Sequence, residues 1–96
     1  MGGEVKVERV RAVVHGRVQG IGYRWFVRDT ASDLRLSGWV RNLQDGSVEL
    51  EAEGPAGDLE RLQAALRTGH PYARVDRVES SRVEPRGKKG TFDIVI

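Results

Sequence analysis

The amino-acid sequence predicts an α+β sandwich in which two helices cover one face of a largely antiparallel sheet. Two patterns predict it. Segments in which apolar and polar residues alternate are typical of half-buried strands, and they are separated by two segments whose apolar residues recur every three or four positions, as on one face of a helix. The predicted order is βαββαβ, followed by a short extra strand. A chain of 96 residues suits one core, so we expect residues 1–96 to form a single domain.

The first strand and the first helix are separated by a glycine-rich segment. Residues 5–14 are rich in valine and alternate with a period of two, which predicts a strand whose inner face carries Val10, Ala12 and Val14. Residues 23–34 predict an amphipathic helix. Its buried stripe is expected to be Tyr23, Val27, Thr30, Ala31 and Leu34.

A hairpin follows the first helix. Residues 36–41 predict the second strand, and residues 48–53 show the cleanest alternation in the chain and predict the third. Between them lies the pair Asp45-Gly46, which is typical of hairpin turns. In the third strand the side chains expected to face outward are those of Glu49, Glu51 and Glu53.

The last part of the chain supplies a second helix and two strands. Pro55 suits the first turn of a helix and Gly69 suits the position just past its end. The expected buried stripe between them is Leu59, Leu62, Ala65 and Leu66. Residues 75–83 predict a fourth strand and residues 92–96 a short final one, so the whole order is that of the ferredoxin-like, or split βαβ, sandwich.

This topology predicts where two distant segments meet. The first and second strands run parallel, joined by a right-handed crossover, and the third strand lies between them. The glycine-rich loop of residues 16–22 leaves the end of the first strand, and Asn42 lies at the end of the second. Both should therefore lie at one edge of the sheet, about 10 Å apart, which is twice the spacing between strands. A loop that leans across this gap could enclose a small ion.

The loop itself, in the segment GRVQGIGYR of residues 16–24, suits an anion. Glycines let several backbone N–H groups point to one spot, and the helix that follows adds unpaired N–H groups and partial positive charge. Arg24, in the first helical turn, could bind a phosphate or carboxylate with two N–H groups. Neither the Walker spacing nor the dinucleotide-binding spacing fits the three glycines. The glycines could equally serve only a tight connection between strand and helix.

The composition of the chain limits the kinds of site and partner that we expect. Cysteine is absent and there are two histidines, so a transition-metal site is not expected and no cofactor is implied. The net charge is +2, and the basic residues are spread along the chain rather than clustered, which argues against nucleic acid as a partner. We see no signal peptide and no apolar run that could cross a membrane, and we expect a cytoplasmic monomer.

Residues 16–24 resemble the signature of acylphosphatases, with Ile21 where valine is usual. The segment GWVRNLQDGSVELEAEG, residues 38–54, resembles the second conserved region of the same family, in which an asparagine follows Gly-Trp/Tyr-Val-x. The resemblance spans nearly the whole chain in order and spacing. It implies an enzyme that hydrolyses acyl phosphates to a carboxylate and inorganic phosphate, with no metal and no phosphoenzyme.

The resemblance also implies roles for residues. Arg24 would bind the phosphate and Asn42 would position the attacking water, and these are the expected catalytic residues. The backbone of the loop would hold the phosphate, and the substrate-binding residues expected on this basis are Gly16, Arg17, Val18, Gln19, Gly20, Ile21, Gly22 and Tyr23. Because an acyl phosphate already has a carboxylate as its leaving group, positioning and charge stabilisation suffice, without strong general acid catalysis.

Several alternatives stay open. His15 lies at the entrance of the loop and could act as a general base, although an exposed residue at the end of a strand is the simpler interpretation. Asp45 is expected to be a turn residue, and Trp25 and Trp39 packing residues. The same order of elements also occurs in RNA-recognition modules, but three outward glutamates on the third strand would repel a phosphate backbone. A non-catalytic anion-binding or regulatory domain is the remaining rival.

Overall fold

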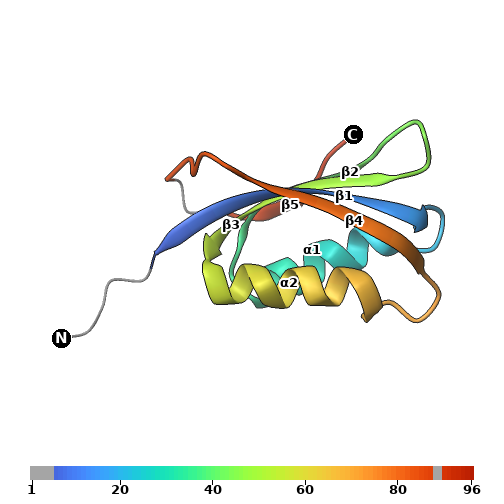
Figure 1. Cartoon of the computed structure of the whole chain (residues 1–96), viewed down its shortest axis with the longest axis horizontal. Coiled ribbons are helices and arrows are strands. Elements are labelled where there is room, and N and C mark those ends of the chain that lie inside the picture. Colours follow the sequence, from blue (N-terminus) through green and yellow to red (C-terminus); the bar gives the residue numbers. More distant parts are fainter. Residues whose placement is uncertain (1–5, 88–89) are drawn as a thin grey trace.

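The computed structural model describes residues 6–87 and 90–96. Within these residues, two helices cover one face of a single five-stranded sheet, and the other face is open (Figure 1). The elements are β1 (Val7–Arg17), α1 (Tyr23–Asp33), β2 (Ser37–Asn42), β3 (Val48–Pro55), α2 (Ala56–Thr68), β4 (Arg74–Val83) and β5 (Phe92–Ile94). The predicted α+β, ferredoxin-like fold class and the order βαββαβ with an extra strand are confirmed.

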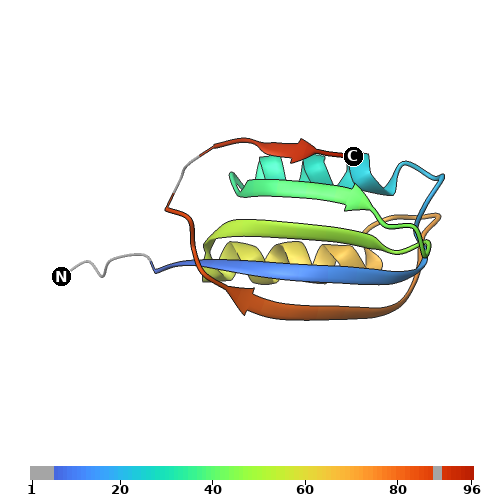
Figure 2. The same ribbon diagram turned by 90° about the horizontal axis from the view of Figure 1, so that it is seen from above.

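The order of strands in the sheet is β4-β1-β3-β2-β5 (Figure 2). The first four strands pair antiparallel, and β5 pairs parallel with β2 at one edge. As predicted, β3 lies between β1 and β2. Val48 of β3 is paired with Val14 of β1 on one side and with Asn42 of β2 on the other. The carboxyl ends of β1 and β2 therefore lie on the same side of the sheet, separated by two strand spacings, or about 10 Å.

The core lies between the sheet and the helices. The inner faces of β1 and β3 and the predicted helix stripes meet there, and the fully buried members include Val14, Tyr23, Val27, Val40, Leu50, Leu62 and Leu66. The hydroxyl group of Tyr23 donates a hydrogen bond to the carbonyl oxygen of Leu66 at 2.7 Å. Burial raises the pKa of Tyr23, so the phenol stays protonated and remains a donor. This bond ties the start of α1 to the last turns of α2.

Some boundaries differ from the predicted ones. Val5 lies outside the described residues, and β1 continues to Arg17 rather than ending at Val14. After a register shift between His15 and Gly16, Gly16 and Arg17 still pair with β4. A Cβ atom on Gly16 would lie 2.1 Å from the carbonyl oxygen of Arg74, so only glycine allows β4 to approach here. Periodicity could not reveal this pairing, because it depends on a strand almost sixty residues away.

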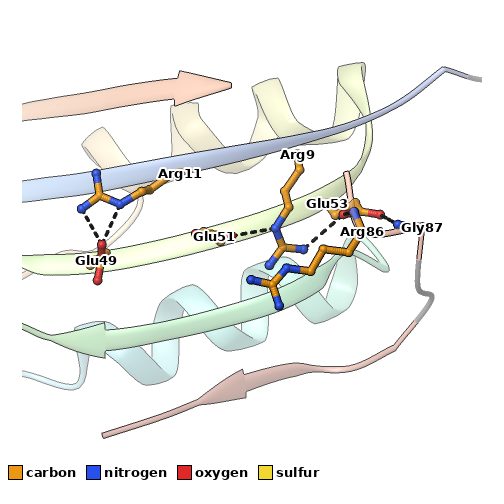
Figure 3. Close-up of polar contacts among 7 residues, drawn as sticks. All are labelled: Arg9, Arg11, Glu49, Glu51, Glu53, Arg86 and Gly87. Carbon is orange, nitrogen blue, oxygen red and sulfur yellow. Dashed lines mark hydrogen bonds and ion pairs between the residues drawn. The ribbon is translucent and has the colours of Figure 1, made fainter. Parts of the chain in front are cut away.

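Arginine and glutamate side chains form a ladder across β1, β3 and β2 on the open face of the sheet. Figure 3 shows the part of it that joins β1 to β3. The Arg–Glu ladder consists of Arg9, Arg11, Arg41, Glu49, Glu51 and Glu53. Arg9 donates from Nε to Glu51 at 2.7 Å and from Nη1 to Glu53 at 3.2 Å. Arg11 and Arg41, from the two strands flanking β3, each donate from Nε to Glu49 at 2.7 Å.

The three glutamates lie on the face predicted for them, but Glu49 and Glu53 are buried under their partners. Burial by itself would raise the pKa of Glu53, but the backbone N–H groups of Arg86 and Gly87, at 2.7 and 2.9 Å, and the guanidinium of Arg9 outweigh it and hold the pKa below its usual value. Burial by itself would also raise the pKa of Glu49, but the guanidinium groups of Arg41 and Arg11 outweigh it and lower this pKa. The glutamates are therefore neutralised ion-pair partners, and the repulsion of nucleic acid expected from them is weaker than the sequence indicated.

Candidate functional site

The glycine-rich segment has two parts with different surroundings. Gly16 and Arg17 belong to β1, whereas residues 18–22 form the connection to α1. The side chain of Val18 is buried and that of Ile21 packs against the core. These two apolar side chains anchor the connection to the core.

The side chain of Gln19 joins this connection to the turn between β2 and β3. Its Nε2 atom donates to the carbonyl oxygens of Leu43 and Ser47, at 2.8 and 2.9 Å. The N–H group of Leu43 closes the same turn on the carbonyl oxygen of Ser47 at 2.8 Å. Because Leu43 follows Asn42 directly, these bonds hold the loop beside Asn42. Sequence reasoning considered only the backbone of Gln19, since no sequence pattern reveals carbonyl groups contributed by another turn.

The start of α1 has no side-chain cap. Gly22 occupies the N-cap position in the left-handed region, with φ of 78°, and the first turn contains no acidic residue. The first bond that closes a helical turn runs from the N–H group of Phe26 to the carbonyl oxygen of Gly22, at 3.1 Å. The N–H groups of the three residues before Phe26 precede any such bond, which leaves partial positive charge at this end of the helix.

A small cavity lies where the loop, the start of α1 and the end of β2 meet. Its volume is about 110 Å³, and it is lined by Val18, Gln19, Gly20, Gly22, Tyr23, Arg24, Trp25 and Asn42. It thus brings together the two residues predicted to be catalytic. Val18 and Tyr23 point their side chains into the core, so they can offer this cavity only their backbone. We call this space the loop cavity.

A second, more open cavity adjoins the loop cavity. It measures about 440 Å³ and is lined by Gly16, Arg17, Val18, Gln19, Gly46, Arg74 and Asp76. Of the predicted substrate-binding residues, Gly16 and Arg17 line this second cavity rather than the loop cavity, and Ile21 lines neither. Val18 and Gln19 line both, so the two spaces lie on either side of the same piece of backbone.

The charge of the loop cavity is not compensated by protein groups. Among residues 6–87 and 90–96, no ion pair or side-chain hydrogen bond involves Arg24, and none involves the carboxamide of Asn42. No acidic residue lines this cavity. An uncapped helix start, a free guanidinium and a free carboxamide around one space form an arrangement suited to a small anion.

Three further residues were singled out in the sequence: His15, Asp45 and Trp25. The Nε2 atom of His15 lies 2.6 Å from Oε1 of Glu79 on β4, and His15 lines neither cavity. Asp45 is a turn residue, as predicted, and the hydroxyl and N–H groups of Ser47 that donate to it lower its pKa. Trp25 was predicted to be a packing residue, but it is 55% exposed and lines the loop cavity.

The described part of the chain contains no cluster of three or more histidine, cysteine or acidic side chains that could hold a metal ion. In the same residues, both helices are too short and too polar to span a lipid bilayer.

The fold is that of a ferredoxin-like α+β protein, with a small cavity between a glycine loop and a helix start. Comparison with known proteins is more specific: the family model described as Acylphosphatase matches residues 10–94. The chain belongs to the acylphosphatase family, which confirms both the resemblance seen in the sequence and the prediction of an enzyme of this class.

Individual relatives agree with this assignment. The chain is 53% identical over 75 residues to an acylphosphatase of Cupriavidus necator, covering 78% of this chain and 82% of the relative. It is similar to the crystal structure of acylphosphatase from Bacillus subtilis, with a TM-score of 0.88, 37% identity, and 93% of this chain and 99% of that chain covered. It is also similar to HypF of Thermococcus kodakarensis, with a TM-score of 0.80 and 33% identity, covering 93% of this chain but 12% of that one.

Proposed function

We propose that this chain hydrolyses the carboxyl–phosphate bond of acyl phosphates in the loop cavity, without a metal ion. One observation carries the proposal. An unpaired guanidinium, an unpaired carboxamide and an uncapped helix start all border a single cavity of about 110 Å³. Membership of the acylphosphatase family supplies the reaction class, and the convergence supplies the residues.

The phosphoryl group is held by backbone N–H groups and by Arg24. The donors come from the connection of residues 18–22 and from the start of α1, where the helix dipole favours negative charge. Arg24 adds two N–H groups in a planar fork that matches two phosphate oxygens. Because these donors are already in place before the substrate arrives, charge that develops in the transition state is stabilised at little cost in reorganisation.

Asn42 orients the water molecule that attacks. Its carboxamide accepts one hydrogen bond and donates another, but it cannot take the proton of water at neutral pH. The water oxygen forms a bond to phosphorus while the bond from phosphorus to the carboxyl oxygen breaks, and the electron pair leaves with the carboxylate. The proton of the water passes to a phosphate oxygen, so no side chain has to act as a general base.

The experiment that tests the proposal measures phosphate release from benzoyl phosphate in the presence of a chelator, for the wild type and for Asn42→Ala. We expect the variant to lose about 10²–10³ in kcat while inorganic phosphate still inhibits it with an unchanged constant. Gln44→Ala is the matched control, because Gln44 is an exposed amide in the same turn that lines neither cavity. Equal turnover by Asn42→Ala and the wild type would remove Asn42 from the mechanism.

The sequence further favours a single domain acting as a cytoplasmic monomer, with no nucleic acid or membrane as partner. On the open face of the sheet, the arginines that could contact nucleic acid phosphates are instead engaged by glutamates of the Arg–Glu ladder. Light scattering coupled to size-exclusion chromatography tests the monomer, and titration with single-stranded RNA at low salt tests the absence of RNA binding.

One rival function has an observation in its favour. The match to HypF covers nearly all of this chain but a small part of that protein, so a similar fold also occurs as a piece of a larger one. A non-catalytic anion-binding domain would bind inorganic phosphate but release none from acyl phosphates in the wild type. The assay above separates this alternative from catalysis.

A further inference from the structure

The loop cavity accommodates only part of an acyl phosphate. Its volume of about 110 Å³ is well below the roughly 300–1,000 Å³ of pockets that enclose a drug-sized ligand. A phosphoryl group fits such a space, but a phosphoryl group together with an aromatic or branched acyl group does not. When phosphate occupies the loop cavity, the acyl group must therefore lie outside it. The adjoining second cavity offers the acyl group the charged side chains of Arg17, Arg74 and Asp76. The rim of the loop cavity offers an apolar side chain instead.

Trp25 is the large apolar residue at this rim. It lines the loop cavity next to Arg24, in the first turn of α1, and it is 55% exposed. The other apolar side chains of the lining, those of Val18 and Tyr23, are buried in the core. An exposed indole at the rim of a cavity offers a large, flat apolar surface on which an apolar group of a ligand can pack.

Arg28 holds this indole in place. Its Cζ atom lies 4.3 Å from the centre of the Trp25 ring, and its Nη2 atom is fixed in turn by Oδ1 of Asp29 at 3.0 Å. The indole is 55% exposed although the guanidinium lies over it, and no aromatic ring of the described residues contacts Trp25, so part of its surface is accessible to a ligand. Since the ring is already restrained, a ligand that packs on it loses less of its affinity to ordering the side chain.

We propose that Trp25 is a specificity-determining residue that packs against the acyl group and makes the enzyme favour aromatic or other large apolar acyl phosphates over small ones. The proposal rests on hydrolysis of acyl phosphates in the loop cavity, and it adds a preference among them. The phosphoryl group is held by the loop and Arg24 whichever acyl group is attached. The preference therefore resides in KM, because packing on the indole is the same in the bound substrate and in the transition state.

The test compares kcat/KM for benzoyl phosphate and for acetyl phosphate in the wild type and in Trp25→Ala. We expect the ratio of the two values to fall by about three- to tenfold in the variant, mostly through KM for benzoyl phosphate. Trp25→Phe should keep most of the preference, because phenylalanine retains a ring. The inhibition constant of inorganic phosphate should be the same in all three proteins, since the loop and Arg24, rather than the indole, hold the phosphate.

Tyr72→Ala is the matched control. Tyr72 is 78% exposed but lines neither cavity, so its removal should leave the ratio unchanged. An unchanged ratio in Trp25→Ala, or an equal loss for both substrates, would overturn the role of Trp25. A wild type that releases phosphate from neither substrate would instead overturn the proposed function, so the two failures are distinguishable.

Discussion

The open face of the sheet and the loop cavity use the same kind of side chain in opposite ways. In the Arg–Glu ladder, Arg9, Arg11 and Arg41 all donate hydrogen bonds to glutamates of β3. Arg24, in contrast, has no protein partner among residues 6–87 and 90–96. The two regions lie on one small sheet, but the arginines of the Arg–Glu ladder are paired with carboxylates and the arginine of the loop cavity is not.

This difference indicates which charges serve stability and which serve binding. A buried carboxylate such as Glu53 needs all its partners, because an unpaired buried charge costs several kcal/mol. An unpaired guanidinium beside an uncapped helix start instead destabilises the folded protein only slightly. In the proposed function, a bound anion would offset this destabilisation. Substitutions in the ladder should therefore affect stability, and substitutions in the loop cavity should affect turnover.

The largest effect is expected for Arg24→Ala. Removal of a positioned charged donor should lower kcat/KM for benzoyl phosphate by about 10²–10³, equivalent to about 2.7–4 kcal/mol of transition-state stabilisation. Because Arg24 has no partner to lose, the free energy of unfolding should change by less than about 0.5 kcal/mol. Steady-state kinetics and urea unfolding measure the two quantities.

Arg67→Ala, at an exposed position near the end of α2, is the control for the loss of one positive charge. It should change neither quantity. A strong loss of stability in Arg24→Ala would contradict the separation of the two regions.

A smaller effect is expected for Glu53→Ala, and it should appear in stability rather than in turnover. The substitution removes the acceptor of the Arg86 and Gly87 N–H groups and leaves the guanidinium of Arg9 with one partner fewer. The free energy of unfolding should fall by about 2–4 kcal/mol. The kcat of the folded variant should stay within about twofold of the wild type. Glu60→Ala, at an exposed position of α2, should change stability by less than about 0.5 kcal/mol.

The smallest effect concerns acid. Hydrogen bonds from arginines hold the pKa of Glu49 below the ordinary value of 4.5, although burial opposes them. The unfolded chain therefore takes up a proton at a higher pH than the folded chain. The contribution of the ionised Glu49 side chain to stability is complete above about pH 4.5 and is lost as the pH falls through the lower pKa of the folded protein. Urea unfolding of Glu49→Gln between pH 7 and 3 should show a shallower loss of stability than the wild type, and parallel curves would contradict this account.

The fold could be predicted from local patterns, because burial on one face repeats within a few residues. The alternation in residues 48–53 and the stripe of Tyr23, Val27 and Ala31 identified a strand and a helix correctly. The glycines between β1 and α1, with Asn42 at the end of β2, were sufficient to place the candidate site at one edge of the sheet. The family signature then supplied the chemistry that spacing could not.

Other features depend on contacts between residues far apart in the chain, which no local period encodes. The register that pairs Val48 with both Val14 and Asn42, and the bonds from Gln19 to the turn, bring the loop to Asn42. Whether Glu53 would be solvated or buried under Arg9 depended on the pairing of β1 with β3. Helical spacing could not reveal that Trp25 lies at the rim of a cavity, because exposure is decided by which elements pack around a residue and not by its own neighbours in sequence.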